Sequence, residues 1–126
     1  MTPAELLADF QGRSFALLVG IDRYRSKSLT SLSCAAKDVR AVGEALIAQG
    51  GFAKDNVTLL VDEEATREKA FGAFAAIAER LRQTRRARGT KTRFLFYFAG
   101  HGVPTQRRGS PETMLATYDA EPSQAY

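Results

Sequence analysis

The sequence predicts an α/β fold in which a mostly parallel sheet has helices on both faces, giving three layers. Three apolar runs carry this prediction, at residues 15–21 (FALLVGI), 57–61 (VTLLV) and 94–98 (FLFYF). Apolar runs without alternation are typical of strands that are buried on both faces. Segments with helical periodicity separate the runs, and this strand–helix alternation favours parallel pairing through right-handed crossovers.

Three helices are predicted around these strands. Thr2 and Glu5 form a capping box, which predicts a short helix over about residues 3–9. Apolar residues at helical spacing predict a second helix around residues 39–47, and Thr66 is a suitable cap for a third. The apolar stripe of the third helix consists of Phe71, Phe74, Ile77, Ala78 and Leu81.

The pattern weakens beyond Gly109. Residues 113–118 (TMLATY) predict one further strand at the sheet edge, and residues 119–126 a loop. Residues 1–126 are interpreted as a single domain portion with its core over about residues 13–121. Because three or four strands give the helices little sheet to cover, we expect further polypeptide of this domain, either C-terminal or on a separate fragment.

The composition favours a cytoplasmic globular protein. Hydrophobic residues make up 44% of the chain, which is enough to build one core. A single cysteine allows no intrachain disulfide, so a reducing cytoplasm is the expected location. The N-terminus does not resemble a signal peptide, and apolar stretches fall far short of the roughly 20 residues that span a bilayer, so no membrane association is expected.

The net charge of +4 is unevenly distributed. A basic cluster could bind phosphate backbones, but basic residues at the C-terminal end of a helix also favour the helix dipole and keep the segment solvated. The second interpretation is the more common one, so nucleic-acid binding is not expected. The cluster comprises Arg80, Arg82, Arg85, Arg86, Arg88, Lys91 and Arg93.

Polar residues follow the three predicted strands, at the sheet edge where parallel α/β proteins collect their functional groups. Asp22 and Asp62 follow the first two, and two carboxylates there would suit a hard cation such as magnesium, as in receiver domains. The third strand instead ends in Gly100-His101-Gly102, and no phosphate-cradling glycine loop follows the first strand. No metal and no cofactor are therefore expected. His101, the single histidine, is the best catalytic candidate, although a lone histidine can also be a simple loop residue.

Residues 96–102 (FYFAGHG) resemble the strand and Gly-His-Gly turn of caspase-like cysteine endopeptidases of the metacaspase type. Asp22-Arg23-Tyr24 is similar to the opening segment of that family, and residues 33–41 (SCAAKDVRA) to the start of its first helix. The resemblance covers about residues 13–121, which is the N-terminal, large-subunit portion of such a domain. It implies a caspase-like fold, a protein or peptide substrate, a regulatory or effector domain elsewhere in the protein, and a bacterial source with a role in defence.

The resemblance also implies roles for three residues. His101 would be the histidine of a Cys–His dyad, because a thiolate attacks the peptide carbonyl and a nearby imidazolium lowers the pKa of the thiol. The N–H of Gly102 would bind the oxyanion. Asp38 would line the pocket for the residue before the scissile bond, which favours cleavage after Arg or Lys; it could equally be an acidic residue favoured at a helix N-terminus.

The nucleophilic cysteine is where the sequence departs from the family. In caspases it follows the histidine by about 50 residues, which lies beyond residue 126, so the expected partner is a C-terminal catalytic fragment that bears it. Cys34 lies at the start of the first predicted crossover helix, and free cysteines are more often small buried hydrophobes than nucleophiles. The chain alone is therefore expected to be inactive. The alternative is an inactive caspase homologue that serves as a protein-interaction module.

Overall fold

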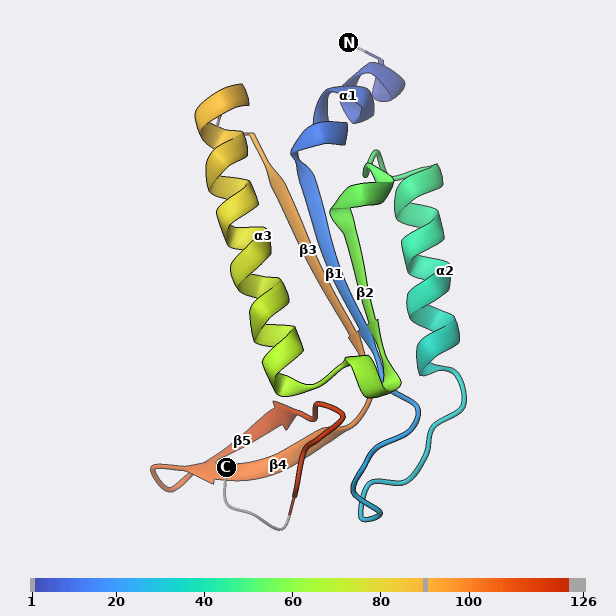
Figure 1. The fold of residues 1–126 in the computed structure, drawn as a ribbon, viewed down its shortest axis with the longest axis vertical. Helices are drawn as coiled ribbons and strands as arrows, with labels where there is room; N and C mark the ends of the chain where they lie inside the picture. Colours follow the sequence, from blue (N-terminus) through green and yellow to red (C-terminus); the bar gives the residue numbers. More distant parts are fainter. Residues whose placement is uncertain (1, 90, 123–126) are drawn as a thin grey trace.

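The computed structural model describes residues 2–89 and 91–122. A three-stranded parallel sheet of order β2-β1-β3 forms its centre (Figure 1). In register, Leu18 of β1 lies opposite Leu59 of β2 and Tyr97 of β3, which confirms the predicted parallel sheet. The strands are β1 (Ser14–Gly20), β2 (Val57–Val61) and β3 (Arg93–Ala99).

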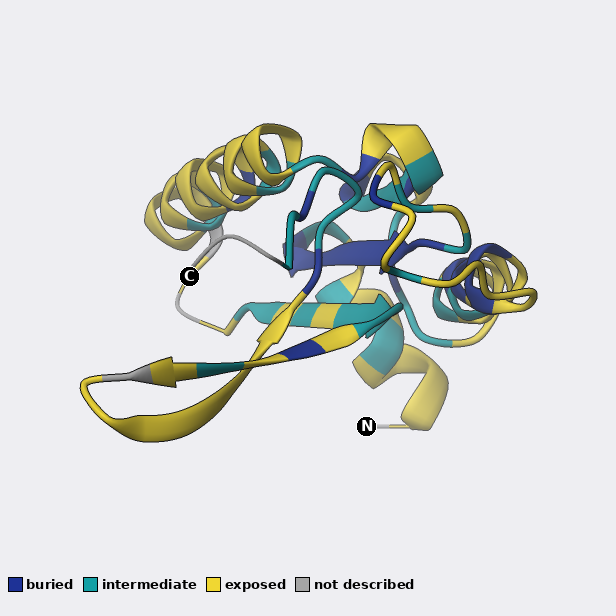
Figure 2. Cartoon of the chain, turned by 90° about the horizontal axis from the view of Figure 1, so that it is seen from below, coloured by how far each residue is buried: buried dark blue, intermediate teal, exposed yellow. Residues whose placement is uncertain are grey.

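The two faces of β1 are covered by different helices. Leu17 and Val19 pack in one cluster with Ile77 of α3 (Arg67–Arg88). Leu18 packs in a second cluster with Val39 of α2 (Ala35–Ala48). The predicted three-layer arrangement is thus confirmed, with the buried β1 between the two helices (Figure 2).

Two helices begin at the threonine caps that the sequence indicates, whereas α2 begins at Ala35, before the predicted start near residue 39. The Thr2 hydroxyl accepts a hydrogen bond of 3.1 Å from the Glu5 N–H, and the Thr66 hydroxyl accepts one of 3.2 Å from the Lys69 N–H. Satisfying these otherwise unpaired amides is what makes threonine a good cap. The remaining helical segments are α1 (Pro3–Phe10) and the 3₁₀ turns η1 (Gln11–Arg13), η2 (Lys54–Asn56) and η3 (Asp62–Glu64).

Beyond β3 the chain forms an antiparallel hairpin of β4 (Gly102–Arg107) and β5 (Ser110–Leu115), which projects from the carboxyl ends of the main strands (Figures 1 and 2). The strand predicted at residues 113–118 is therefore present in part, as β5, but its predicted place at the edge of the main sheet was wrong. Arg108 and Gly109 have positive φ angles of 52° and 79°, which is the geometry of a two-residue hairpin turn. So tight a turn pairs the two segments with each other, whereas a parallel addition to the sheet needs a crossover of a dozen residues.

Part of the apolar surface of β3 and α3 is uncovered. Among the described residues β3 pairs only with β1, so its other edge is open. Phe96 is 39% exposed and Phe71 61% exposed, although both belong to predicted apolar segments. Together with the hairpin these side chains border a groove of about 740 Å³. We call this surface the open apolar face; it consists of Phe71, Phe74, Phe94, Phe96, Met114 and Leu115.

Two members of the basic cluster have structural roles. The Arg93 guanidinium lies over the ring of Phe52, at 4.7 Å, and donates a 2.8 Å hydrogen bond to the Ser14 hydroxyl. Arg80 lies 4.8 Å from the ring of Phe15 and donates to the Asn56 side chain at 2.5 Å. Arginine therefore contributes here to packing as well as to surface charge. None of the described helices is both long and apolar enough to cross a membrane.

Candidate active site

His101 lies at the carboxyl end of β3 and directly precedes β4. Its backbone is held on both sides. The His101 N–H donates a 2.8 Å hydrogen bond to the Tyr24 hydroxyl, and its carbonyl accepts one of 2.9 Å from the Ala116 N–H. The site therefore joins three segments: the loop after β1, the turn after β3 and the end of the hairpin.

The imidazole of His101 is half-buried and fixed by two contacts. Its Nε2 lies 2.7 Å from the backbone carbonyl oxygen of Thr30, and its ring is tilted by 55° against the Tyr24 ring at a centroid distance of 5.2 Å. Because a carbonyl oxygen can only accept, Nε2 carries the proton. The lone pair of the neutral ring is therefore on Nδ1, which is the atom available to act as a base.

Gly102 begins β4 and pairs with Leu115 of β5. Because the Ala116 N–H bonds to the carbonyl of His101, the Gly102–Leu115 pair is of the non-hydrogen-bonded type in the antiparallel ladder. The N–H of such a residue points away from the partner strand. The geometry thus leaves the Gly102 N–H directed away from the hairpin, as an oxyanion-binding group requires.

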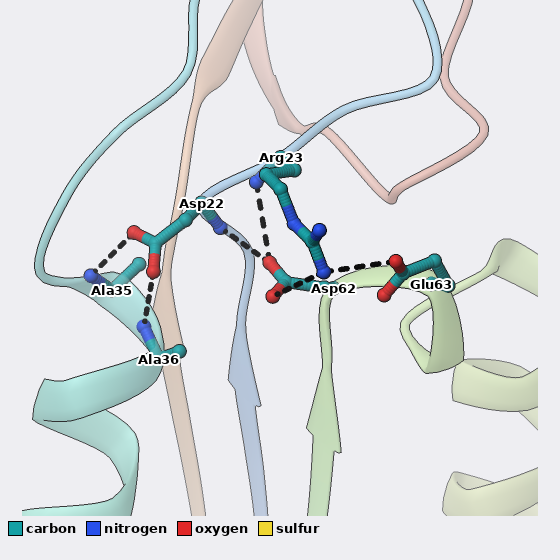
Figure 3. Close-up of polar contacts among 6 residues, drawn as sticks. All are labelled: Asp22, Arg23, Ala35, Ala36, Asp62 and Glu63. Atoms are coloured by element: carbon teal, nitrogen blue, oxygen red, sulfur yellow. Dashed lines mark hydrogen bonds and ion pairs between the residues drawn. The ribbon is translucent and has the colours of Figure 1, made fainter.

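The carboxylates of Asp22 and Asp62 both bind backbone amides (Figure 3). The Asp22 carboxylate accepts hydrogen bonds of 2.8 and 3.2 Å from the N–H groups of Ala35 and Ala36, at the start of α2. Asp62, with a positive φ of 50°, accepts from the N–H of Asp22 at 2.9 Å and forms an ion pair with Arg23. Within the described residues no group of three or more metal-ligating side chains could hold an ion. These two carboxylates therefore organise the loop.

Asp38 lies in the first turn of α2, and its side chain is exposed. Asp22 fixes the helix that carries it, because the Asp22 carboxylate caps α2 and its carbonyl accepts the Leu32 N–H at 2.8 Å. The segment so fixed also contains Thr30, whose carbonyl contacts His101. One loop therefore places both the partner of the histidine and the start of the helix bearing Asp38.

The family model described as metacaspase, peptidase C14 domain matches residues 15–121. The matched span contains the parallel sheet, both crossover helices, the Gly-His-Gly turn and the hairpin. The chain belongs to the metacaspase family. As a member of a peptidase family it is related to enzymes that act on protein substrates. No curated protein matches the chain.

The single cysteine of these 126 residues makes none of the contacts that hold His101 among the described residues. Cys34 is exposed at the N-cap position of α2, with its Sγ 3.7 Å from the Ser33 hydroxyl. Among the described residues the contacts of Cys34 and those of His101 have no residue in common. Cys34 thus lies at the start of the helix, and no hydrogen bond joins it to His101 within the part of the chain that the structure describes.

Sequence reasoning missed the role of Tyr24 in the metacaspase domain. Tyr24 was noted only as part of a segment similar to the family, yet its hydroxyl accepts from His101 and donates to the Ala116 carbonyl at 3.1 Å. Burial raises the pKa of Tyr24, and the hydrogen bond from the His101 backbone opposes that shift in part. These contacts join residues far apart in the chain, so no local pattern indicates them.

Proposed function

We propose that this chain is the histidine-bearing part of a cysteine endopeptidase that cleaves protein substrates after Arg or Lys. The observation that carries the proposal is the contact of His101 with Thr30. Its Nε2 lies 2.7 Å from the Thr30 carbonyl oxygen, which can only accept, so Nδ1 is the ring nitrogen left to act as a base at the carboxyl edge of the sheet. A base oriented in this way by a third group is the arrangement found beside activated nucleophiles.

The proposed reaction uses His101 twice. Nδ1 accepts the proton of a cysteine thiol, and the resulting thiolate attacks the carbonyl carbon of the scissile peptide bond. The imidazolium then gives this proton to the leaving amine as the C–N bond breaks, which leaves a thioester. Water hydrolyses the thioester when Nδ1 accepts its proton, and the thiol is restored. In both halves the Thr30 carbonyl stabilises the imidazolium by accepting its Nε2–H.

Gly102 supplies the proposed electrostatic stabilisation. Its N–H points away from β5 and lies one residue from the base, so it is suited to the negative oxygen that develops on the attacked carbonyl. A side chain at this position would crowd the hairpin, because a Cβ on Gly102 would lie 3.1 Å from the Thr113 methyl group. Glycine at this position therefore lets β4 pack against β5 without a clash and leaves its N–H open to the substrate carbonyl.

The nucleophilic cysteine, in this proposal, lies on polypeptide outside these 126 residues and is brought to His101 when the rest of the domain pairs with β3. The open edge of β3 and the open apolar face support this, because an exposed strand edge flanked by aromatic side chains needs a cover. The ring of Phe74 already lies 5.1 Å from that of Phe96, so the surface is preformed. A cysteine nucleophile works only when reduced, which favours a cytoplasmic location.

Cleavage after a basic residue is proposed from Asp38. Its carboxylate is exposed and forms none of the ion pairs found within the described residues, so it can bind a substrate guanidinium or ammonium group. A carboxylate facing an arginine forms two parallel charge-assisted hydrogen bonds. The capped and anchored start of α2 holds this group in a defined place.

The test is a fluorogenic peptide assay on the full-length protein carrying Cys34→Ser, so that a thiol alkylator reports on another cysteine. We expect cleavage of Arg and Lys peptides, its loss on alkylation, and a fall of at least about 1000-fold in kcat/KM for His101→Ala. Full activity of His101→Ala would refute the assignment. An inert protein would instead favour the inactive interaction module.

The specificity is tested separately with Asp38→Ala. We expect about a 100-fold loss of kcat/KM on Arg peptides, because a bound cation would be left without its partner. The matched control is Glu44→Ala, which removes another exposed carboxylate from the same helix and should leave the rate unchanged. Preferential cleavage after aspartate would overturn the assignment of Asp38.

A further inference from the structure

The antiparallel ladder of the hairpin ends in an unusual way at the catalytic candidate. The register pairs Val103 with Met114 and Gly102 with Leu115, so His101 comes opposite Ala116. His101 and Ala116 therefore occupy a hydrogen-bonded position of the ladder, where the two opposite residues normally exchange two backbone hydrogen bonds. One of them is present, from the Ala116 N–H to the His101 carbonyl at 2.9 Å.

The second bond is replaced by the hydroxyl of Tyr24. The His101 N–H donates to Tyr24 Oη at 2.8 Å, and the same hydroxyl donates to the Ala116 carbonyl at 3.1 Å. The hydroxyl group is thus inserted between the donor and the acceptor of a ladder bond. Tyrosine can do this because a phenolic hydroxyl both accepts and donates. The pair of His101 and Ala116 is thus closed by one direct backbone hydrogen bond and by one bridge through the hydroxyl.

Gly100 is what allows the hydroxyl to enter. A Cβ built on Gly100 would lie 2.6 Å from Tyr24 Oη and 2.9 Å from the Phe98 ring. Any side chain at this position would push the hydroxyl out. Glycine is therefore needed at position 100 because the Tyr24 hydroxyl occupies the space that a side chain would take.

The inserted hydroxyl also sets the place of the imidazole. It fixes the His101 backbone while the Tyr24 ring lies against the histidine ring, and Thr30, on the same loop, holds Nε2 from another side. The loop itself is tied to the molecule where the Arg25 N–H donates to the Tyr118 carbonyl at 3.1 Å. Backbone and ring of His101 are thus located by a single loop.

We infer that Tyr24 is a positioning residue for His101, whose hydroxyl bridge keeps the strand end open and aims Nδ1 at the nucleophile. Without the hydroxyl, His101 and Ala116 either close the ladder or leave two polar groups without partners. Either change displaces the backbone that carries the base. The catalytic part of this inference rests on the proposed peptidase function; the bridge itself does not.

The bridge is tested by NMR on the 126-residue chain, where the single histidine gives unambiguous imidazole signals. In the unmodified chain the His101 N–H should exchange slowly, unlike the N–H of Thr113, which pairs with Pro104 in a non-hydrogen-bonded position and points away from β4. The His101 ring should be the Nε2–H tautomer. In Tyr24→Phe we expect about tenfold faster exchange of the His101 N–H, since about one hydrogen bond is lost, together with a mixture of tautomers. The control Tyr97→Phe removes a hydroxyl from β3 and should change neither signal.

Kinetics of the full-length protein test the catalytic part. Tyr24→Phe should lower kcat by about 100-fold through misplacement of the base, with KM changed by less than about threefold. Rapid exchange of His101 in the unmodified chain, or identical His101 signals in Tyr24→Phe and Tyr97→Phe, would overturn the inference. An altered NMR signature in a protein that cleaves nothing would count against the proposed function while leaving the bridge in place.

Discussion

Removal of the Asp22 carboxylate should measurably destabilise the fold. In Asp22→Ala the N–H groups of Ala35 and Ala36 lose acceptors at 2.8 and 3.2 Å, so α2 loses its cap. Loss of a capping side chain costs about 1 kcal/mol, and loss of a negative charge beside a helix N-terminus costs up to about 1 kcal/mol more. We therefore expect the free energy of unfolding to fall by about 2 kcal/mol.

This change is measurable by urea and thermal unfolding followed by circular dichroism. A loss of about 2 kcal/mol corresponds to a Tm lowered by about 8 °C in a chain of this size. Asp22→Asn keeps one acceptor oxygen and should cost about half as much. Glu63→Ala is the matched control, because it removes a carboxylate from the same network whose ion pair with Arg23 is exposed.

The reasoning would be refuted by a particular pattern of unfolding energies. If Asp22→Ala and Glu63→Ala both stayed within about 0.5 kcal/mol of the unmodified chain, the carboxylate would not be capping α2. Equal losses in Asp22→Ala and Asp22→Asn would show that the single oxygen which asparagine retains contributes nothing by itself, so that the stabilisation depends on the complete carboxylate. A two-state transition with an unchanged slope in urea is needed for these comparisons.

Three further changes have defined outcomes. Burial alone would raise the pKa of Asp119, but hydrogen bonds, led by the one from the Arg67 N–H, hold this pKa below its usual value. The carboxylate therefore stabilises the fold above about pH 4, and this contribution is lost as the pH falls through the folded pKa. Asp119→Asn should therefore flatten the acid side of the stability profile. Gly20→Ala should lower the free energy of unfolding by about 2 kcal/mol, because its Cβ would meet a buried valine methyl at 2.6 Å. Gly72→Ala, on an open part of the helix surface, should raise the free energy of unfolding by about 0.5–1 kcal/mol, and denaturant titrations measure both changes. Arg108→Gly should raise the Tm, since it relieves about 1 kcal/mol of left-handed backbone strain; an unchanged Tm would contradict this.

Local signals in the sequence predicted the central part of the fold. The apolar run of β1 predicts its place because a strand covered on both faces needs apolar side chains at every position, and β1 is buried throughout. The runs of β2 and β3 predict strands as well, although Phe94 and Phe96 of β3 are exposed among the described residues. The caps at Thr2 and Thr66 mark helix starts because hydroxyl acceptors satisfy free amides within three residues along the chain. The Gly-His-Gly turn identified His101 through resemblance, and the family match confirms the metacaspase domain to which it belongs.

The tertiary structure alone decided how these parts meet. Tyr24 reaches His101 across 77 residues, and Asp22 reaches Asp62 across 40, so no periodicity within a segment could indicate either contact. The strand preceding residue 108 was missed because a polar, exposed hairpin has neither the apolar run nor the buried face on which the prediction depends. Residue types and short spacings thus determine which segments are strands and helices. Side-chain contacts between distant segments determine where the histidine lies and which atoms hold it, and those contacts exist only once the chain is folded.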